Sequence, residues 1–379
     1  MSTAERIIMG NLQKAGIKVN GRKPWDIQVH NEDVFRRFLI GGSLGVGESY
    51  MDGGWDAAGL DEFFTRVFET NAHRLVVGRS ILAHVAKAVL MDLCSCKRAF
   101  EVGRSHYDLG NGLYEKMLDE SMTYSCGYWR SGVETLHQAQ MAKYDLICRK
   151  LGLQLGMRIL EIGCGWGGFA RYAAEECGVS VIGLTISKEQ AHFAQTKCVN
   201  LPVSVLLQDY RSSSLRHLYG TFDRVVSIGM FEHVGYKHYS TYMKIVRRFL
   251  NPDGLFLLHT IGNNVSQLTT DRWIDKYIFP NSMLPSMRQI AAATEGLFVT
   301  EDWHSFGPDY DRTLMEWHRN FCRNWSEITK LGAQFDEKFR RMWEFYLLSC
   351  AGLFRARQAQ LWQFVLSPNG VAGSYESVR

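Results

Sequence analysis

The sequence predicts an α/β protein with a doubly wound parallel sheet of about seven strands, preceded by a smaller N-terminal domain. From Met157 onward, short apolar strands alternate with helical patterns, which is typical of a parallel sheet. A glycine-rich turn, LEIGCGWGGFA (Leu160–Ala170), joins the first of these strands to a helix. The 379 residues, 46% hydrophobic and 22% charged, are enough to bury a core of this size.

The part before the sheet divides into two segments. Residues 1–75 carry short helical patterns and glycine turns, and we expect a small domain there. Residues 76–104 continue a basic amphipathic stretch that begins at Arg74, in which arginine and lysine outnumber Asp92 and Glu101. Such a stretch either lies on an anionic membrane surface or packs as an interdomain helix, and the sequence leaves both open. We expect residues 105–379 to form the larger domain that contains the sheet.

Seven strands are expected in order along the chain. They are Arg158–Ile162, Ser180–Leu184, Val203–Gln208, Arg224–Ile228, Leu255–Thr260, Leu297–Trp303 and Leu361–Leu366. The segment Asn251–Gly254, NPDG, predicts a turn before the fifth strand. A long amphipathic helix is expected over Phe335–Arg357.

Composition and short sequence patterns argue against several classes of protein. The formal charge of +4 is too mild to indicate a nucleic-acid partner, and no apolar run reaches the roughly 20 residues that span a bilayer. The first residues lack the apolar core of a signal peptide, and nine scattered cysteines fit a reducing cytoplasm. No metal site is predicted, because Cys94-Ser-Cys96 has no partner pair at zinc spacing.

The glycine turn indicates which ligand it holds. Gly163, Gly165 and Gly167 have a spacing that differs from the dinucleotide pattern, and Glu161 stands two residues before them. A carboxylate there would repel phosphates but would suit a cationic ligand without phosphate, such as S-adenosylmethionine. Trp166 agrees, because a pyrophosphate needs close backbone approach at that level. The alternative is a turn that only packs the helix on the strand.

The next two strand ends complete a pocket for an adenosine ligand. Thr185 stands where many such folds have an acidic residue for the ribose, and Gln190 follows in the next helix. After the third strand, Asp209 can accept a hydrogen bond from the adenine amino group, and Tyr210 can pack against the base.

Several motifs together resemble the cyclopropane-fatty-acyl-phospholipid synthases. The likeness runs from about Gly16 to Leu366 and is carried by HYDLGNGLYEKMLDESMTYSCGYW, LEIGCGWGGFA, GLTISKEQ, SIGMFEHVG, LLHTIG, KYIFPNSMLPS and SCAGLFRAR. The resemblance implies a class I S-adenosylmethionine methyltransferase fold with a small N-terminal lipid-associated domain. It also implies methyl transfer to the cis double bond of an acyl chain in membrane phospholipid, followed by proton loss and ring closure. A homodimer attached peripherally to the cytoplasmic side of the inner membrane is expected on the same ground.

The resemblance also assigns site residues. Tyr124, Ser125 and the glycine turn would contact the donor, and Thr185, Gln190, Asp209 and Tyr210 would complete its pocket. A bicarbonate ion would lie beside the alkene, held around Cys126, Glu232, His259, Ile261 and Tyr310. Cys350, in SCAGLFRAR, is a position where the family has been credited with an active-site thiol.

The chemistry explains some of these residue types. The cation left by methyl attack is strongly acidic, so a weak base such as bicarbonate suffices. Glu232 follows the fourth strand and His259 ends the fifth, so both lie at the carboxyl edge of the sheet. Without the resemblance, His259 would be interpreted as a satisfied buried histidine. Methyl transfer to an alkene needs no covalent nucleophile, so Cys350 is equally explained as a small buried packing residue.

Two rival functions stay open on the sequence. One is a methyltransferase of the same superfamily that acts on another acceptor, or that leaves a methyl branch without closing a ring. The other is a non-catalytic membrane- or RNA-binding protein on a methyltransferase scaffold. The presence of Glu232, His259 and Tyr310 argues against the second rival.

Overall fold

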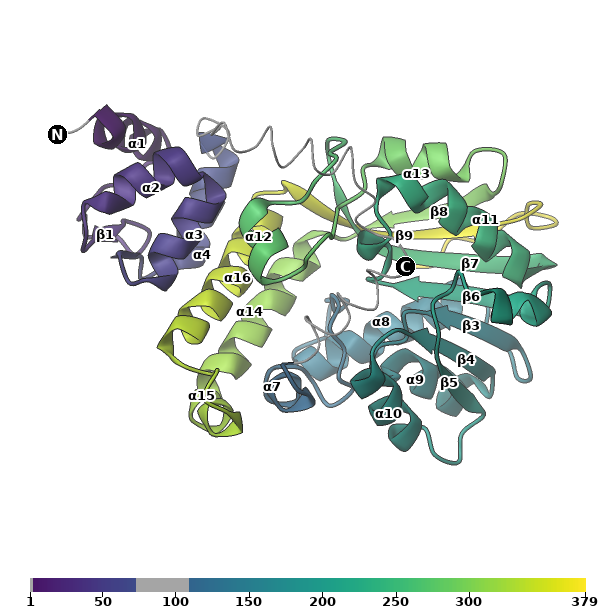
Figure 1. Ribbon diagram of the computed structural model, residues 1–379. Helices are drawn as coiled ribbons and strands as arrows, with labels where there is room; N and C mark the ends of the chain where they lie inside the picture. Colours follow the sequence, from purple (N-terminus) through teal and green to yellow (C-terminus); the bar gives the residue numbers. More distant parts are fainter. Residues whose placement is uncertain (1–2, 73–108) are drawn as a thin grey trace. The chain divides into compact units, whose positions relative to one another are not determined.

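The computed structural model describes residues 3–72 and 109–379, which pack as two units (Figure 1). The bounds of the first unit are Met1–Met91, Leu268–Pro280 and Tyr310–Ala359, and those of the second are Asp92–Gln267, Asn281–Asp309 and Gln360–Arg379. The basic segment 76–104 expected from the sequence lies outside the described residues. Within the described ranges, no helix is long and apolar enough to cross a membrane.

The second unit contains a seven-stranded sheet in the order β5-β4-β3-β6-β7-β9-β8. Its strands are β3 (Arg158–Ile162), β4 (Ser180–Thr185), β5 (Val203–Leu207), β6 (Phe222–Ile228), β7 (Leu250–Asn263), β8 (Val299–Ser305) and β9 (Ala359–Ser367). The pairs β4–β5, β3–β4, β3–β6 and β6–β7 are parallel, and β8 is antiparallel to β9. The strand order reverses at β3, and doubly wound sheets bind ligands at such a point. The predicted α/β class and all seven strands are confirmed.

Strand β7 corrects one detail of the sequence prediction. The segment 251–254, expected as a turn before the strand, lies within it as a bulge. Phe222 pairs with Leu250 and Arg224 pairs with Leu255, so a single residue of β6, Asp223, faces the whole bulge. The bulge is held there because the Asn251 side chain donates a hydrogen bond to the Asp223 carboxylate at 2.8 Å. A proline–glycine signal marks irregular backbone but does not tell a turn from a bulge.

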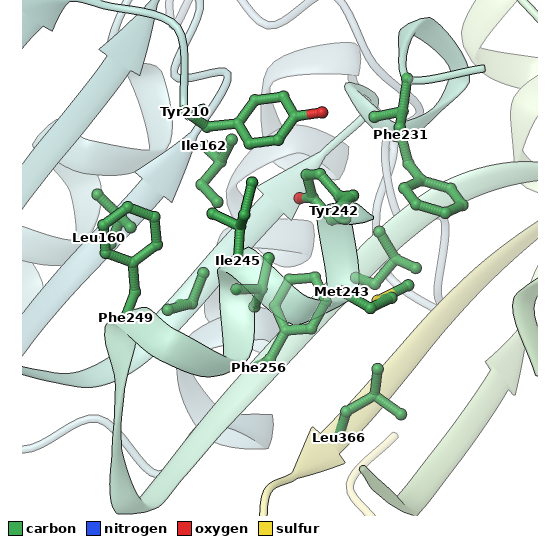
Figure 2. Packing of buried hydrophobic residues seen from close by; sticks show 14 of the residues in the cluster. Leu160, Ile162, Tyr210, Phe231, Tyr242, Met243, Ile245, Phe249, Phe256 and Leu366 are labelled. Carbon is green, nitrogen blue, oxygen red and sulfur yellow. The ribbon is translucent and has the colours of Figure 1, made fainter. Parts of the chain in front are cut away.

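Both faces of the sheet are covered, because alternate residues of each strand point to opposite sides. Leu160 and Ile162 of β3 join one buried cluster with residues of α11 (Tyr239–Phe249) and α13 (Met287–Thr294). Figure 2 shows this cluster, in which Tyr242 and Phe249 of α11 lie among residues of β3 and β7. Ile159 joins a second cluster with residues of α8 (Leu136–Lys150) and α9 (Gly168–Cys177). The two clusters fix β3 firmly at the centre.

The second unit is completed by shorter elements. They are α7 (Asn111–Met117), α10 (Lys188–Lys197) and the 3-10 turns η2 (Ser213–Leu218), η3 (Phe231–His233) and η4 (Tyr236–His238). Helix α8 begins with a capping box, in which the Thr135 side chain accepts the Gln138 N–H and Gln138 bonds back to the Thr135 backbone. Helix α10 begins with a cap from Ser187 to the Gln190 N–H.

The first unit is mainly helical. Its elements are α1 (Thr3–Lys14), β1 (Gln28–Val29), α2 (Asp33–Gly41), α3 (Ser43–Met51), β2 (Trp55–Asp56), α4 (Leu60–Glu69), α12 (Arg272–Tyr277), α14 (Pro308–Arg323), α15 (Trp325–Ile328), η5 (Thr329–Leu331) and α16 (Glu337–Arg355). The helix expected over Phe335–Arg357 is thus present as α16. Its Phe345 ring packs on Tyr50 and Phe64 of the N-terminal helices.

The packing therefore groups the chain differently from the linear division at residues 75 and 104. Helices α12, α14 and α16 belong with the N-terminal helices, although they follow the sheet strands in sequence. Arg355 of α16 donates hydrogen bonds to Asp61 at 2.7 Å and to Asp311 at 2.9 Å, which ties α4 and α14 to α16. Helical periodicity shows which face of α16 is apolar but not which element covers it.

Candidate active site

The glycine turn after β3 has a backbone that favours glycine at each predicted position. Gly163, Gly165 and Gly167 have φ angles of +85°, +52° and +83°, a region that L side chains rarely adopt. The N–H groups of Gly163 and Cys164 both donate to the Leu184 carbonyl at 2.9 Å, which ties the turn to β4. A side chain at Gly163 would overlap Met230, whereas the space at Gly165 is open. A ligand can therefore approach the backbone at Gly165.

Glu161 is buried on β3 beside this turn. Its carboxylate accepts a hydrogen bond from the Ala170 backbone, and Oε2 has no partner in the described part of the chain. Burial raises the pKa of Glu161 to about 8, while the charge of Lys143 opposes that rise. A buried carboxylate oxygen without a partner is costly unless a ligand supplies a donor or a positive charge. The geometry fits the ammonium group of S-adenosylmethionine.

Lys143 is a site residue that the sequence prediction missed. It lies fully buried on α8, where Nζ donates to the Ser125 hydroxyl at 2.6 Å and to Gln140 Oε1 at 2.7 Å. Gln140 in turn donates Nε2 to the Ser125 carbonyl at 2.8 Å. Burial lowers the pKa of Lys143 to about 7, against the charges of Cys126, Asp119 and Glu161. Lys143 and Gln140 thus fix the segment around Ser125 and place a cation near Glu161.

A sequence signal for this pair existed. Gln140 and Lys143 are three residues apart on the buried face of α8, among Leu136, Ala139 and Ile147. Polar side chains on an apolar helix face have to find partners inside the protein. Hydrophobic periodicity identifies the apolar face of the helix but assigns no role to polar residues within that face, so it does not predict Gln140 and Lys143 as site residues.

The other predicted donor contacts lie at the ends of β4 and β5. Thr185 donates its hydroxyl to Gln190 Oε1 at 2.9 Å, and both side chains are buried. Asp209 is held by Arg211, which donates Nε and Nη2 to its two oxygens at 2.8 and 2.7 Å. The Tyr210 ring lies 5.1 Å from Tyr242, edge to face. Arg211 is a second polar partner that the sequence prediction missed, and the adenine contact of Asp209 stays a prediction.

The predicted segment Tyr124–Cys126 is a loop before α8. The Tyr124 ring lies edge to face on Tyr114 at 5.2 Å, and Tyr114 in turn lies 4.9 Å from Trp166 of the glycine turn. Cys126 is fully buried and its thiol donates to the Gly127 carbonyl at 3.1 Å. Aromatic contacts and the hydrogen bonds from α8 therefore link this loop to the glycine turn.

Glu232 lies in η3, just after β6, and is buried. Its Oε1 accepts the Ile261 N–H at 2.7 Å, and Oε2 has no partner among the described residues. Burial raises the pKa of Glu232 to about 7, opposed mainly by the hydrogen bond from Ile261. The carboxyl group can therefore gain or lose a proton near neutral pH, as a general acid or base must.

His259 lies on β7, two residues before Ile261, so the two side chains project to the same face of the strand. Its Nδ1 accepts a hydrogen bond from the Gln363 amide nitrogen at 3.2 Å, which puts the ring proton on Nε2. Nε2 has no partner within residues 109–379, and burial keeps the pKa of His259 well below its usual range. The ring is a neutral donor without an acceptor, and an anion would satisfy it.

The structure thus brings part of the predicted set together. Ile228, the last residue of β6, pairs with His259 of the neighbouring strand β7, so Glu232 and His259 lie toward the same edge of the sheet. The Ile261 N–H also donates directly to Glu232. Each of the two side chains keeps one unpartnered buried atom, an acceptor on Glu232 and a donor on His259. Gln363 on β9, which fixes the imidazole tautomer, was not predicted, because a strand glutamine carries no local signal.

Tyr310 and Cys350 belong to the first unit. Tyr310 on α14 stacks on Phe354 with ring centroids 4.5 Å apart and meets Trp317 edge to face. Burial raises the pKa of Cys350 to about 12, with a smaller contribution from Asp271. A thiol with this pKa stays protonated at neutral pH and is a poor nucleophile. This agrees with a packing role for Cys350 on α16.

Comparison with known proteins gives a consistent result. The family model for mycolic acid cyclopropane synthetase matches residues 94–364, more than half of the chain. The cyclopropane-fatty-acyl-phospholipid synthase of Escherichia coli strain K12 is 52% identical over 363 residues, which cover 96% of this chain and 93% of that protein. A Pseudomonas putida protein named "Probable fatty acid methyltransferase" is 39% identical over 69% of this chain and 67% of its own.

A solved structure agrees with these sequence matches. The mycolic acid cyclopropane synthase CmaA1, crystallised with SAH and CTAB, is 34% identical and has a TM-score of 0.64. The alignment covers 70% of this chain and 97% of that one. The E. coli protein, in contrast, also matches the N-terminal part of the chain, as its 96% coverage requires.

Proposed function

The chain belongs to the mycolic acid cyclopropane synthetase family, and from this premise we propose that it makes cyclopropane fatty acyl phospholipids. It is an S-adenosylmethionine-dependent methyltransferase that acts on unsaturated lipid. The observation that carries the proposal is the 52% identity to the E. coli phospholipid enzyme over 96% of the chain. That match covers nearly the whole chain, whereas the alignment with CmaA1 covers 70% of it.

The donor pocket is proposed from the residues around the glycine turn. When bound, S-adenosylmethionine supplies an electrophilic methyl group on a positively charged sulfur. Glu161 would accept from its ammonium group, because the carboxylate has an unpartnered buried oxygen. The remaining contacts are proposed for Tyr124, Ser125, Gly163, Gly165, Gly167, Thr185, Gln190, Asp209 and Tyr210. Lys143 and Gln140 would act as positioning residues that hold Ser125 in place.

Glu232 and His259 are proposed to handle the proton. Methylation of the alkene would break the bond between the methyl carbon and the sulfonium sulfur, which leaves as a neutral thioether, and would form one carbon–carbon bond, so the positive charge passes to the acyl chain. Loss of one proton from the added methyl group then closes the ring, so the product gains one CH₂ and one proton is released. Bicarbonate is the proposed base, held by the Nε2–H of His259, by Glu232 and by Cys126 and Ile261. Tyr310 is kept as a proposed neighbour on the ground of the family motif alone.

A lipid profile tests this function. Expression in a host that lacks ring-containing lipids should yield phospholipids one CH₂ heavier that have lost their olefinic proton signals. Glu232→Gln, expressed to the same level, is the matched control and should give no such lipids. An unchanged profile with folded wild-type protein contradicts the proposal.

A second function is favoured by the match to the P. putida protein, whose name is a fatty acid methyltransferase. In that case the product is a methyl branch without a ring. A methyl-branched alkene has the same mass as the cyclopropane, so proton NMR separates them by high-field ring signals. Retained olefinic signals would decide for the branched product.

Membrane contact is proposed for residues 1–75 and the basic segment 76–104. Each arginine or lysine near an anionic surface contributes about 1 kcal/mol, which salt weakens. The protein would then work at the cytoplasmic face of the inner membrane. Sedimentation with liposomes should show binding that rises with anionic lipid and falls with ionic strength, and binding indifferent to both contradicts the proposal.

A homodimer is proposed as well, on the ground of the family resemblance alone, and two copies would double the membrane contacts and raise the avidity. Analytical ultracentrifugation of the full chain measures this directly. A monomeric mass at micromolar concentration contradicts it.

A further inference from the structure

Three metal-type side chains meet in the first unit, and none of them was assigned to the site above. His318 and Cys322 lie on α14, and Glu344 lies on α16. One ligand atom from each falls within 4.8 Å of the others. The Cys322 sulfur is 3.3 Å from His318 Nε2 and 3.8 Å from Glu344 Oε1.

The helices explain why these side chains converge. His318 and Cys322 are four residues apart, which places them on the same face of α14, one turn from each other. Arg355 ties α14 to α16 through Asp311. Cys322 is exposed, and His318 and Glu344 are half-buried, so an ion can reach all three from solvent.

We propose that His318, Cys322 and Glu344 bind a zinc ion between α14 and α16. Imidazole nitrogen, thiolate and carboxylate are the three ligand types that zinc accepts, and hard cations such as Mg²⁺ and Ca²⁺ avoid the first two. Three protein ligands leave a fourth position for water in a tetrahedral site. The ion would clamp two helices of the first unit together, and its binding does not depend on the proposed function.

Two groups change when the ion binds. Arg340 donates Nε to Glu344 Oε1 at 3.1 Å, so its guanidinium competes with the metal for that carboxylate. The Cys322 thiol must lose its proton to solvent, because the thiolate is the ligand.

Cobalt is the probe for this site, because Co²⁺ takes zinc ligands and a thiolate ligand gives it a charge-transfer band in the near ultraviolet. Titration of the full chain with Co²⁺ should produce this band, and added Zn²⁺ should abolish it. Cys322→Ser should remove the band, and His318→Ala should weaken Co²⁺ binding by about tenfold or more. Cys177→Ser on α9 is the matched control and should behave as wild type.

Arg340→Gln gives a test that does not depend on losing a ligand. Without its competitor, Glu344 is free for the metal, so this variant should bind Co²⁺ severalfold more tightly than wild type. Weaker or unchanged binding in Arg340→Gln overturns the assignment. A wild type without the charge-transfer band, or a band that persists in Cys322→Ser, overturns it as well.

Discussion

Two buried carboxylates at the carboxyl edge of the sheet make an instructive pair. Glu161, beside the glycine turn, accepts the Ala170 N–H, and Glu232, after β6, accepts the Ile261 N–H; each has an Oε2 without a partner among the described residues. Burial raises both pKa values, to about 8 and about 7. They differ in their neighbours, because the cation of Lys143 acts on Glu161, whereas the opposing influences on Glu232 are hydrogen bonds.

This difference separates their uses. The Glu161 carboxyl has the higher pKa of the two even with Lys143 nearby, so it needs a further cation from a ligand to become fully ionised, and ligand binding and ionisation of Glu161 support each other. A carboxylate without a nearby cation stays poised between its two forms, which suits proton transfer. We therefore assign ligand binding to Glu161 and proton handling to Glu232, and the following predictions test that division.

The largest effect is expected for Glu232→Gln. The amide keeps the size of the side chain but cannot take a proton, so turnover should fall by about 10²–10⁴-fold. Donor affinity should change by less than about threefold, because Glu232 does not hold the donor in this scheme. Steady-state kinetics and calorimetric donor titration measure the two quantities. An equal loss in both would show that Glu232 belongs to the donor pocket.

The same variant should be more stable than wild type at alkaline pH. The pKa of Glu232 rises from 4.5 to about 7 on folding, so the folded state keeps a proton that the unfolded state has lost. Wild-type stability therefore falls as pH rises from 4.5 to 7 and then levels off, by about 3 kcal/mol in total. Glu232→Gln has no carboxyl group at this position, so its stability does not fall over this pH range.

Urea unfolding at pH 4.5 and pH 8 measures the difference. The variant should gain about 3 kcal/mol at pH 8 and almost nothing at pH 4.5. Wild-type unfolding must be reversible at both pH values for the comparison. A stability gain of the same size at both pH values would mean that the gain comes from packing and not from the ionisation of Glu232.

The sequence predicts the position of Glu161 more directly than the positions of Glu232 and His259. Glu161 lies at the end of β3 and the positive-φ glycines follow that strand directly, so a local sequence pattern predicted their positions, and all seven predicted strands are present. Glu232 and His259 were assigned through family motifs. The strand pairing of Ile228 with His259 then puts them on the same edge.

What the sequence could not predict are partners that come from distant elements. The apolar face of α8 indicates that Lys143 needs a buried partner but not that this partner is Ser125, and Gln363 on β9 carries no local signal. The assignment of α16 to the unit of the N-terminal helices has the same cause. Local patterns specify elements and their faces, whereas pairing between faces depends on packing of the whole chain.

Glu161→Gln should mainly weaken donor binding. Hydrogen bonds to charged groups contribute about 1.5–3 kcal/mol, so donor affinity should fall by about 10–100-fold. Turnover at saturating donor should stay within about threefold of wild type. Glu175→Gln on α9, an exposed carboxylate paired with Arg171, is the control and should leave both values unchanged. A turnover loss as large as that of Glu232→Gln would end the proposed division.

The smallest effect, and the sharpest test, is expected for Lys143→Met. Loss of this cation lets the pKa of Glu161 rise further, so donor binding should require a pH higher by about one unit, which weakens affinity about tenfold at neutral pH. Donor titrations from pH 6 to 9 measure this shift, and it should vanish when Glu161→Gln is already present. The pH dependence of turnover at saturating donor should stay close to that of wild type, because Lys143 is absent from the influences on Glu232, and burial, the larger cause, still keeps the pKa of His259 low when the smaller influence of Lys143 is lost. A shift of that profile would mean that both carboxylates share one cation.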